Sequence, residues 1–218
     1  MKWKLFGLAP WLDTRARFVA ALPQGGRLLD LGTSDGETLG HFQELRPDLK
    51  LHAVDLQGKP EGYPQGCEFQ RANLETERLR WADGSFDGIT CMHLVEHLRE
   101  LSHLFGECGR LLKPGGRLYV ETPHPKTMAY SSPQGVGAGT FTMNFFDDLT
   151  HVRIVTVGGM AQRARSAGLN VHQTGISRNW LFAAAWPIMA LAAPSRARYT
   201  AQAHFRGWSS YIVLEKAR

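Results

Sequence analysis

The sequence predicts an α/β protein with a doubly wound, mostly parallel sheet, and three observations support this. Short apolar segments bounded by turn residues alternate with helical patterns along most of the chain, which is typical of a parallel sheet with helices on both faces. Residues Arg27–Gly40 read RLLDLGTSDGETLG, an apolar strand followed by a turn with spaced glycines. The 218 residues are 43% hydrophobic, which is enough for one domain with a sizeable core.

The elements follow in order from this alternation. A helix is expected at Asp13–Ala21, before the first strand. Pro and Gly in Lys113–Gly116 predict a turn before the fifth strand. Further helices are expected over residues 37–45, 101–112 and 157–167, and seven strands over residues 27–31, 51–55, 68–71, 88–92, 117–121, 169–176 and 209–215.

The glycine-rich turn after the first strand indicates a ligand site. Gly tolerates positive φ and lets a ligand approach the backbone closely. The helix expected from Glu37 directs its free N–H groups and positive dipole end at the same place. The turn therefore predicts a small polar cofactor at the carboxyl end of the first strand.

Composition and charge exclude several classes of protein. The net charge is +5, but the basic residues are scattered, so nucleic-acid binding is not expected. Cys67, Cys91 and Cys108 form no CxxC pair, which predicts a reducing compartment without disulfides. The apolar run at the N-terminus is too short for a signal peptide. Trp180–Pro194, at ~15 residues, is too short to span a bilayer, and a cytoplasmic protein is expected.

Four blocks of sequence together resemble class I S-adenosylmethionine (SAM)-dependent methyltransferases. They are LLDLGTSDGETLG, HAVDLQG, WADGSFDGITCMHLVEHL and LLKPGGRLYVETP, beginning at residues 28, 52, 81 and 111. The resemblance covers about Leu28–Gly168. It implies a Rossmann-like sheet of seven strands with an antiparallel last strand, and methyl transfer from SAM. The G-x-G-x-x-G fingerprint of dehydrogenases is absent, because the turn reads G-x-x-x-G-x-x-x-G.

The resemblance also implies which residues bind SAM. The carboxylate of Asp30 would face the cofactor's ammonium group, and that of Asp55 would accept hydrogen bonds from both ribose hydroxyls. Asn73 would bond the adenine amine, although a polar residue after a strand is equally compatible with a plain turn. Ser34 and Asn73 stand where the family often has Gly and Asp. The full set of expected cofactor residues is Asp30, Gly32, Thr33, Ser34, Gly36, Asp55, Leu56, Asn73, Leu74 and His93.

A second chemistry competes for part of these blocks. His93-Leu-Val-Glu96-His97 is H-x-x-E-H, the inverted zinc-peptidase motif, which needs a helix that places both histidines on one face. Alternatively, Glu96 and His97 anchor a loop by hydrogen bonds, which is the preferred interpretation, and no metal ion is expected. A third alternative is an inactive SAM-binding regulatory protein.

The methyl acceptor is expected to be a small-molecule, glycan or lipid-linked compound, methylated at oxygen. A hydroxyl acceptor usually needs a base. The candidates are His124 in TPHP and the pair Asp148 and His151 in FFDDLTHVR, in which the carboxylate would orient the imidazole. This D-x-T-H-x-R segment is similar to one in methyltransferases of bacterial glycan and lipid-carrier pathways. Alternatively, these residues cap or pack the loop.

The chain is expected to form a single methyltransferase domain, residues 1–218. Within it we distinguish an N-terminal helical cap (1–24), a SAM-binding core (25–176), an acceptor loop (123–155) and an apolar insertion (177–207). The insertion is interpreted as a lid, a dimer contact, an interfacial helix pair at the inner membrane face, or core packing beneath the sheet. Apolar residues flanked by Arg and Trp suit a membrane surface. The sequence predicts no particular oligomeric state.

Overall fold

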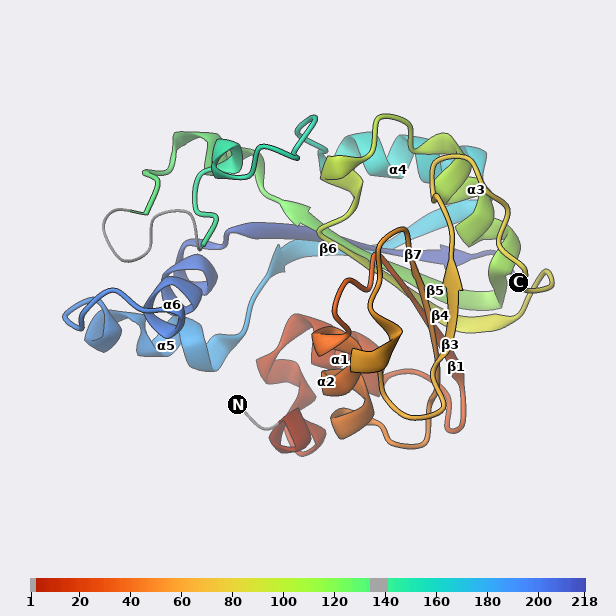
Figure 1. The fold of residues 1–218 in the computed structure, drawn as a ribbon, viewed down its shortest axis with the longest axis horizontal. Coiled ribbons are helices and arrows are strands. Elements are labelled where there is room, and N and C mark those ends of the chain that lie inside the picture. Colours follow the sequence, from red (N-terminus) through yellow and green to blue (C-terminus); the bar gives the residue numbers. More distant parts are fainter. Residues whose placement is uncertain (1–2, 134–140) are drawn as a thin grey trace.

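The computed structural model describes residues 3–133 and 141–218, and within them a single seven-stranded sheet (Figure 1). The strand order is β3-β2-β1-β4-β5-β7-β6. All neighbouring pairs are parallel except those of β7, which runs antiparallel to both β5 and β6. This confirms the doubly wound architecture and the antiparallel last strand. The strands are β1 (Arg27–Leu31), β2 (Lys50–Asp55), β3 (Glu68–Arg71), β4 (Phe86–Met92), β5 (Leu112–Pro123), β6 (Leu169–Ser177) and β7 (Ser209–Lys216).

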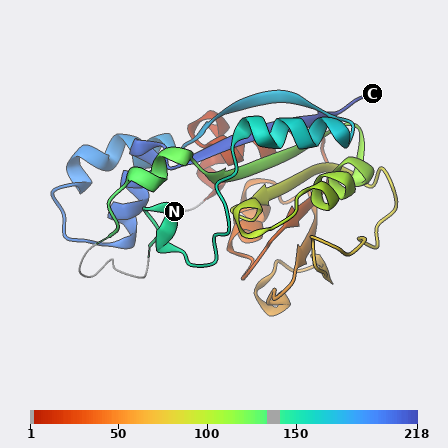
Figure 2. The same ribbon diagram turned by 90° about the horizontal axis from the view of Figure 1, so that it is seen from above.

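Helices cover both faces of this sheet. Figures 1 and 2 show α3 and α4 along one face, while α1 and α2 lie on the other. Short 3-10 helices η1 (Trp3–Gly7) and η2 (Pro10–Leu12) precede α1 and form the N-terminal cap with it. The helices are α1 (Thr14–Ala20), α2 (Glu37–Leu45), α3 (Ser102–Leu111), α4 (Val157–Ser166), α5 (Trp180–Met189) and α6 (Arg196–Arg206).

The two faces of the sheet hold separate hydrophobic clusters. Successive side chains of a strand point to opposite faces, so Leu118 and Val120 of β5 join the cluster under α3 and α4. Tyr119, between them, joins the cluster under α1 and α2. A mostly parallel sheet requires both of its faces to be buried, and these two clusters bury them.

One predicted turn is wrong. Lys113–Gly116 lies inside β5 as an irregularity, because Phe86 pairs with Leu112 while Gly88 already pairs with Arg117. The four residues bulge beside Asp87, whose two oxygens accept hydrogen bonds from Lys113 Nζ at 2.7 and 2.8 Å. Because residues on both sides of the Pro-Gly-Gly segment pair with β4, strand β5 begins at Leu112 rather than at the predicted Arg117.

The insertion at residues 177–207 forms α5 and α6, which pack on each other beyond the sheet rather than beneath it (Figure 1). Core packing is therefore the wrong interpretation: Trp180, Ile188 and Leu191 are 53%, 79% and 90% exposed. Because β6 is antiparallel to β7, and β7 to β5, the connection from β6 to β7 lies at the carboxyl edge of the parallel strands. The helix pair therefore stands where ligands bind in such sheets.

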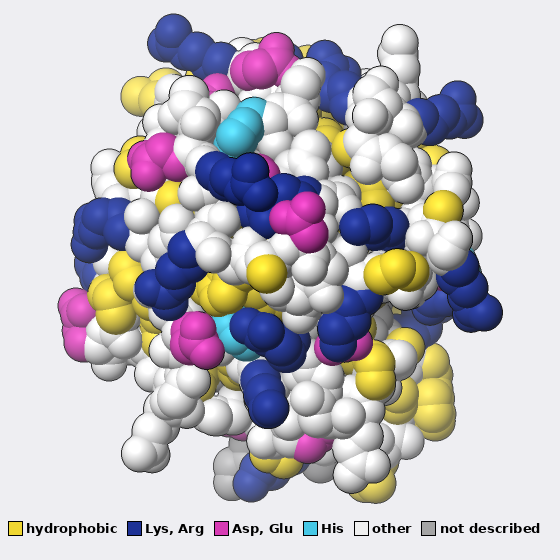
Figure 3. All heavy atoms as spheres, turned by 90° about the vertical axis from the view of Figure 1, so that its right-hand side faces the viewer, with side chains coloured by type: hydrophobic (Ala, Val, Ile, Leu, Met, Phe, Trp, Pro, Cys, Tyr) yellow, Lys and Arg dark blue, Asp and Glu magenta, His cyan; other side chains and the backbone are white. Residues whose placement is uncertain are grey.

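The surface charges are mixed on the face that Figure 3 presents, where basic and acidic side chains intersperse instead of forming a single basic field. Several are paired, among them Arg110 with Glu107 at 2.7 Å. Among the helices of the described segments, none combines the length and the apolarity that crossing a bilayer requires.

Candidate cofactor and acceptor site

The glycine turn lies between β1 and α2 and adopts the conformation that its sequence predicts. Gly32 and Gly36 have φ angles of +76° and +85°, in the left-handed region. The N–H of Gly32 donates to the carbonyl of Val54 at 2.8 Å, which holds the turn against the tip of β2. Ser34 also has a positive φ, +52°, a conformation that glycine adopts at lower cost than serine.

Asp55 ends β2 directly beside this turn. Its Oδ2 accepts a hydrogen bond from the N–H of Ser34 at 2.9 Å, and its Oδ1 accepts one from Gln57 at 2.7 Å. Tyr63 closes the same corner, because its hydroxyl donates to the carbonyl of Ser34 at 3.0 Å. Each carboxylate oxygen keeps a further lone pair. Asp55 is partly exposed, so both oxygens remain available to a diol.

Asp30 lies in β1 with its side chain buried at 2% exposure. Thr90 donates a hydrogen bond to Asp30 Oδ1 at 2.7 Å, and the hydroxyl of Thr33 donates to the carbonyl of Asp30 at 3.0 Å. Burial raises the pKa of Asp30 to about 7 in spite of these bonds. A buried carboxylate of this kind favours a cationic neighbour, as the predicted ammonium contact requires.

This raised pKa predicts a pH-dependent stability. The unfolded chain ionises Asp30 at its ordinary pKa of 3.8, whereas the folded chain retains the proton up to about 7. The folded state therefore binds more protons between these values, and the free energy of unfolding falls as pH rises, by up to about 4 kcal/mol from this group. Asp30→Asn should flatten that fall in urea unfolding at pH 5 to 8. Glu61→Gln, at an exposed position, is the control, and equal pH slopes in all three proteins would contradict the assignment.

The remaining cofactor candidates differ in their surroundings. Asn73 Oδ1 accepts a hydrogen bond from the N–H of Glu75 at 2.9 Å, so its acceptor atom serves the turn, as the plain-turn alternative proposed. Leu74 is buried at 7% exposure in the core under α3. Leu56 follows Asp55 and is 53% exposed, which leaves an apolar side chain open beside the proposed ribose position.

His93 forms an ionic bridge that the sequence did not predict. It follows β4 with a φ of +52°, its Nδ1 lies 3.2 Å from Glu96 Oε1, and its Nε2 lies 3.2 Å from Glu121 Oε1. Burial alone would lower the pKa of His93, but the bonds to Glu121 and Glu96 raise it to about 9. Burial would raise the pKa of Glu121, yet the bond to His93 and the charge of Arg15 hold it well below its usual range.

A cavity of about 340 Å³ opens at the carboxyl ends of β4 and β5, and we call it the acceptor cavity. It adjoins the glycine turn, because Leu94, next to His93, packs against Gly32. A second cavity of about 460 Å³ shares Arg15, Arg196, Thr200 and His204 with it and reaches the start of α2. The acceptor cavity is lined by Arg15, His93, Glu121, Phe141, Ser177, Arg196, Thr200, Ala203, His204, Trp208 and Ser209.

Sequence reasoning missed Arg15, Glu121 and Trp208 of this lining. Glu121 could have been found from the sequence, because it is an acidic residue inside the apolar strand RLYVETP. No sequence pattern indicates Arg15, since it reaches the cavity from the N-terminal cap. Burial lowers the pKa of His204 to about 4. Its Nδ1 accepts the N–H of Asn179 at 3.1 Å. This imidazole is therefore neutral, with its acceptor nitrogen occupied.

The three candidates for a catalytic base lie outside that lining. His124 caps η5 (Pro125–Ala129), because its Nδ1 accepts the N–H of Lys126 at 3.0 Å. Asp148 and His151 do meet, as predicted, with 3.8 Å between Oδ2 and Nε2, but in a turn after η7 (Phe145–Asp147) rather than in a helix. The His151 ring stacks on Phe145 and is 5% exposed. Residues 134–140 of the acceptor loop lie outside the described part of the chain.

The H-x-x-E-H segment does not form the helix that a peptidase would need. His93 follows the end of β4, and only Val95–His97 is helical, as the short 3-10 helix η4. Glu96 is fully buried, and its Oε2 accepts the hydroxyl of Thr122 at 3.1 Å. Its backbone carbonyl accepts the N–H of Val152 at 2.9 Å. The preferred interpretation, that this segment anchors a loop by hydrogen bonds, is confirmed.

The sheet order and the glycine turn with its neighbouring carboxylate define the class I SAM-dependent methyltransferase architecture. The family model described as "Methyltransferase domain" matches residues 5–174, most of the chain. This protein therefore belongs to the methyltransferase-domain family; SAM is its cofactor, and the peptidase alternative is wrong.

Individual relatives agree with this family. A ubiquinone biosynthesis O-methyltransferase of Dechloromonas aromatica (strain RCB) is 27% identical over 168 residues, 71% of this chain and 69% of that protein. One of Xanthomonas oryzae pv. oryzae (strain PXO99A) is 30% identical over 120 residues, and this match spans 49% of this chain and only 47% of that relative's length. The crystal structure of a SAM-dependent methyltransferase from Mesorhizobium loti shares the fold, with a TM-score of 0.64 and 21% identity, covering 96% of this chain and 98% of that one.

Proposed function

We propose that this enzyme transfers the methyl group of SAM to an oxygen atom of a small molecule bound in the acceptor cavity. The observation that carries the proposal is the position of that cavity, at the carboxyl ends of β4 and β5 and next to the glycine turn. A sulfonium is an activated donor, so alignment with the acceptor is the main requirement of the reaction. The two O-methyltransferases similar to this chain support oxygen as the acceptor atom.

The charges of the acceptor cavity favour an acceptor with an anionic group. Arg15 and Arg196 both line it. Arg15 Nε is buried without a hydrogen-bond partner among the described residues, and Oδ1 of Asp13 lies 3.8 Å from it. A carboxylate or phosphate on the acceptor would satisfy this nitrogen. The acceptor class we propose is therefore a hydroxylated aromatic acid, a glycan phosphate or a lipid-linked phosphate.

Turnover tests this proposal directly. Purified protein would be incubated with SAM and each acceptor class, and S-adenosylhomocysteine and a product one methyl heavier would be quantified. We expect turnover with at least one anionic hydroxyl acceptor, and a product whose new methyl group NMR places on oxygen. Tight SAM binding without acceptor-dependent turnover would instead support the inactive regulatory alternative, and methylation at nitrogen would contradict the oxygen assignment.

The pair Asp148 and His151 is proposed to be needed for turnover rather than for SAM binding. His151→Ala should lower kcat about 100-fold, because losing its bond to the Phe145 carbonyl would shift the acceptor loop, and a misplacement of ~1 Å can cost that much. The dissociation constant for SAM should change little, because the residue lies outside the glycine turn. Phe146→Ala is a matched control, since Phe146 lies in the same loop and is 65% exposed. Unchanged turnover of His151→Ala would remove this residue from the machinery.

A further inference from the structure

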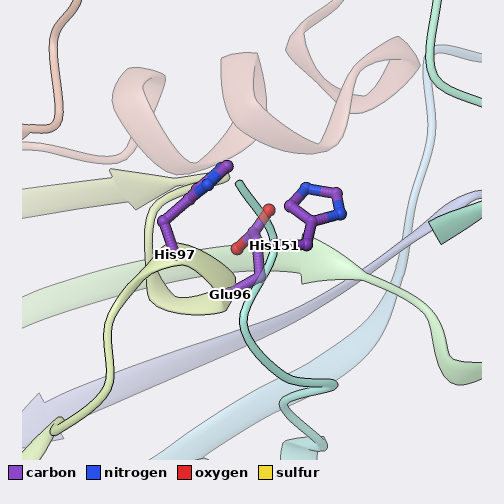
Figure 4. Close-up of side chains that lie close together, drawn as sticks. All are labelled: Glu96, His97 and His151. Carbon is purple, nitrogen blue, oxygen red and sulfur yellow. The ribbon is translucent and has the colours of Figure 1, made fainter. Parts of the chain in front are cut away.

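Glu96, His97 and His151 gather their side chains at one point, although they come from two distant segments (Figure 4). One carboxylate oxygen and one nitrogen of each imidazole lie within 4.8 Å of one another. The sequence predicted no metal here. From this geometry we propose that the three residues bind a divalent transition-metal ion of the zinc type and thereby fasten the acceptor loop to the sheet.

The hydrogen bonds around His97 leave one of its nitrogens free for a metal. The hydroxyl of Thr150 donates to Asp148 Oδ1 at 2.6 Å, and an ionised carboxylate only accepts. The hydroxyl proton of Thr150 is therefore used in the bond to Asp148. Thr150 Oγ1, at 2.9 Å from His97 Nδ1, must then accept a hydrogen bond from the N–H of that nitrogen. His97 is thus held in the tautomer whose Nε2 carries a free lone pair.

His151 is fixed in the same tautomer by a different partner. Its Nδ1 lies 2.6 Å from the carbonyl oxygen of Phe145, which can only accept, so Nδ1 carries the proton. A metal-binding histidine commonly donates its other N–H to a carbonyl or carboxylate in this way, which orients the ring. The two imidazole rings lie next to each other, with their centroids 4.8 Å apart.

Glu96 supplies the oxygen ligand. Its side chain is fully buried, with one bond to His93 and one to Thr122, so its two oxygens still have lone pairs unused. Two imidazoles and one carboxylate are the three protein ligands of several zinc sites that keep a fourth position open. Tetrahedral bonds of about 2.0–2.2 Å would place the ligand atoms about 3.4 Å apart. The three ligand atoms now lie within 4.8 Å of one another, so metal binding would draw them closer by rotation of their side chains.

The ion would join two segments of the site that are far apart in the sequence. Glu96 and His97 belong to the connection after β4, whereas His151 belongs to the acceptor loop of residues 123–155. Val152 already bonds the carbonyl of Glu96, so the segments are held in register without the ion. Glu96 also contacts His93 of the acceptor cavity. The role in fastening this loop rests on the proposed function, whereas the binding of metal does not.

Metal binding can be measured without any turnover assay. Protein freed of metal with a chelator and then desalted would be titrated with Zn²⁺ by calorimetry, and with Co²⁺ by its visible absorption. We expect one ion per chain, a rise in Tm with Zn²⁺, and Co²⁺ bands typical of four or five ligands. His97→Gln and His151→Gln should each weaken Zn²⁺ binding at least about 100-fold. His172→Gln, on the half-exposed β6 histidine, should bind as the native protein does.

A further variant keeps the test valid if the histidine variants misfold. Thr150→Val removes the bond that orients His97 but no ligand, and loss of such a partner costs about 10- to 100-fold in metal affinity. Sub-stoichiometric Zn²⁺ binding, or native affinity in both histidine variants, would overturn the proposal. If the protein binds Zn²⁺ but shows no turnover, the metal site is supported and the proposed function is refuted. If it shows turnover but does not bind Zn²⁺, the proposed function is supported and the metal site is refuted.

Discussion

Replacing Asp55 by alanine is expected to weaken SAM binding about 100-fold. We propose that its two oxygens accept both ribose hydroxyls, and hydrogen bonds to a charged group contribute about 1.5–3 kcal/mol each. The loss of about 3 kcal/mol corresponds to that factor. The same carboxylate also orders the N–H groups of Ser34 and Gln57, so the glycine turn would loosen as well. Calorimetry with SAM and with S-adenosylhomocysteine measures the effect.

Two controls separate the ribose contact from the ordering of the turn. Asp55→Asn keeps one acceptor oxygen and should lose only about tenfold, the value of roughly one charged hydrogen bond. Asp83→Asn changes an acidic residue that is 70% exposed at its side chain, near Arg110 and far from the glycine turn, and should bind SAM normally. Native affinity in Asp55→Ala would contradict the proposed ribose site.

The second large effect is expected from Gly36→Ala. A Cβ on Gly36 would lie 2.4 Å from Cδ1 of Tyr63, and the residue has a φ of +85°. The left-handed conformation costs a non-glycine residue about 1–2 kcal/mol, and overpacking adds about 1–3 kcal/mol. We expect the free energy of unfolding to fall by about 3 kcal/mol, with a further loss of SAM affinity as Tyr63 moves off the turn. Urea unfolding and calorimetry measure the two quantities.

Gly40 provides a matched control on the same helix. It lies inside α2, and a Cβ there would meet no atom within 4 Å. Gly40→Ala should therefore stabilise the protein by about 0.5–1 kcal/mol through the helix propensity of alanine. Equal effects of the two substitutions would show that the conformation and close packing of Gly36 are unimportant.

Local signals were enough to predict the elements around the proposed SAM site. Strand β1, helix α2 and strand β3 have the predicted bounds. Gly26 and Gly32 flank the apolar run of β1, and α2 lies between Gly36 and Pro47. Asp55 at the end of β2 likewise lies against the turn after β1, where its Oδ2 accepts the N–H of Ser34 at 2.9 Å, as expected for the carboxyl ends of neighbouring parallel strands.

The failures came where partners far apart in the chain decide the structure. Lys113–Gly116 reads as a turn, but pairing with β4 on both sides draws it into β5. A helix pair was only one of the interpretations of residues 177–207, because WLFAAAWPIM has no polar face and contains Pro187. The bridge from His93 to Glu121 joins β4 to β5, and Arg15 reaches it from a third segment. No sequence spacing indicates such a contact.

The central claim is that SAM lies across the tips of β1, β2 and β4, with its reactive sulfur facing the acceptor cavity. The most direct measurement is a crystal structure with S-adenosylhomocysteine bound. We predict both ribose hydroxyls within hydrogen-bond distance of the Asp55 oxygens, and the sulfur facing the cavity lined by His93 and Trp208. A nucleoside bound away from Asp55, or a sulfur facing away from that cavity, would contradict the account.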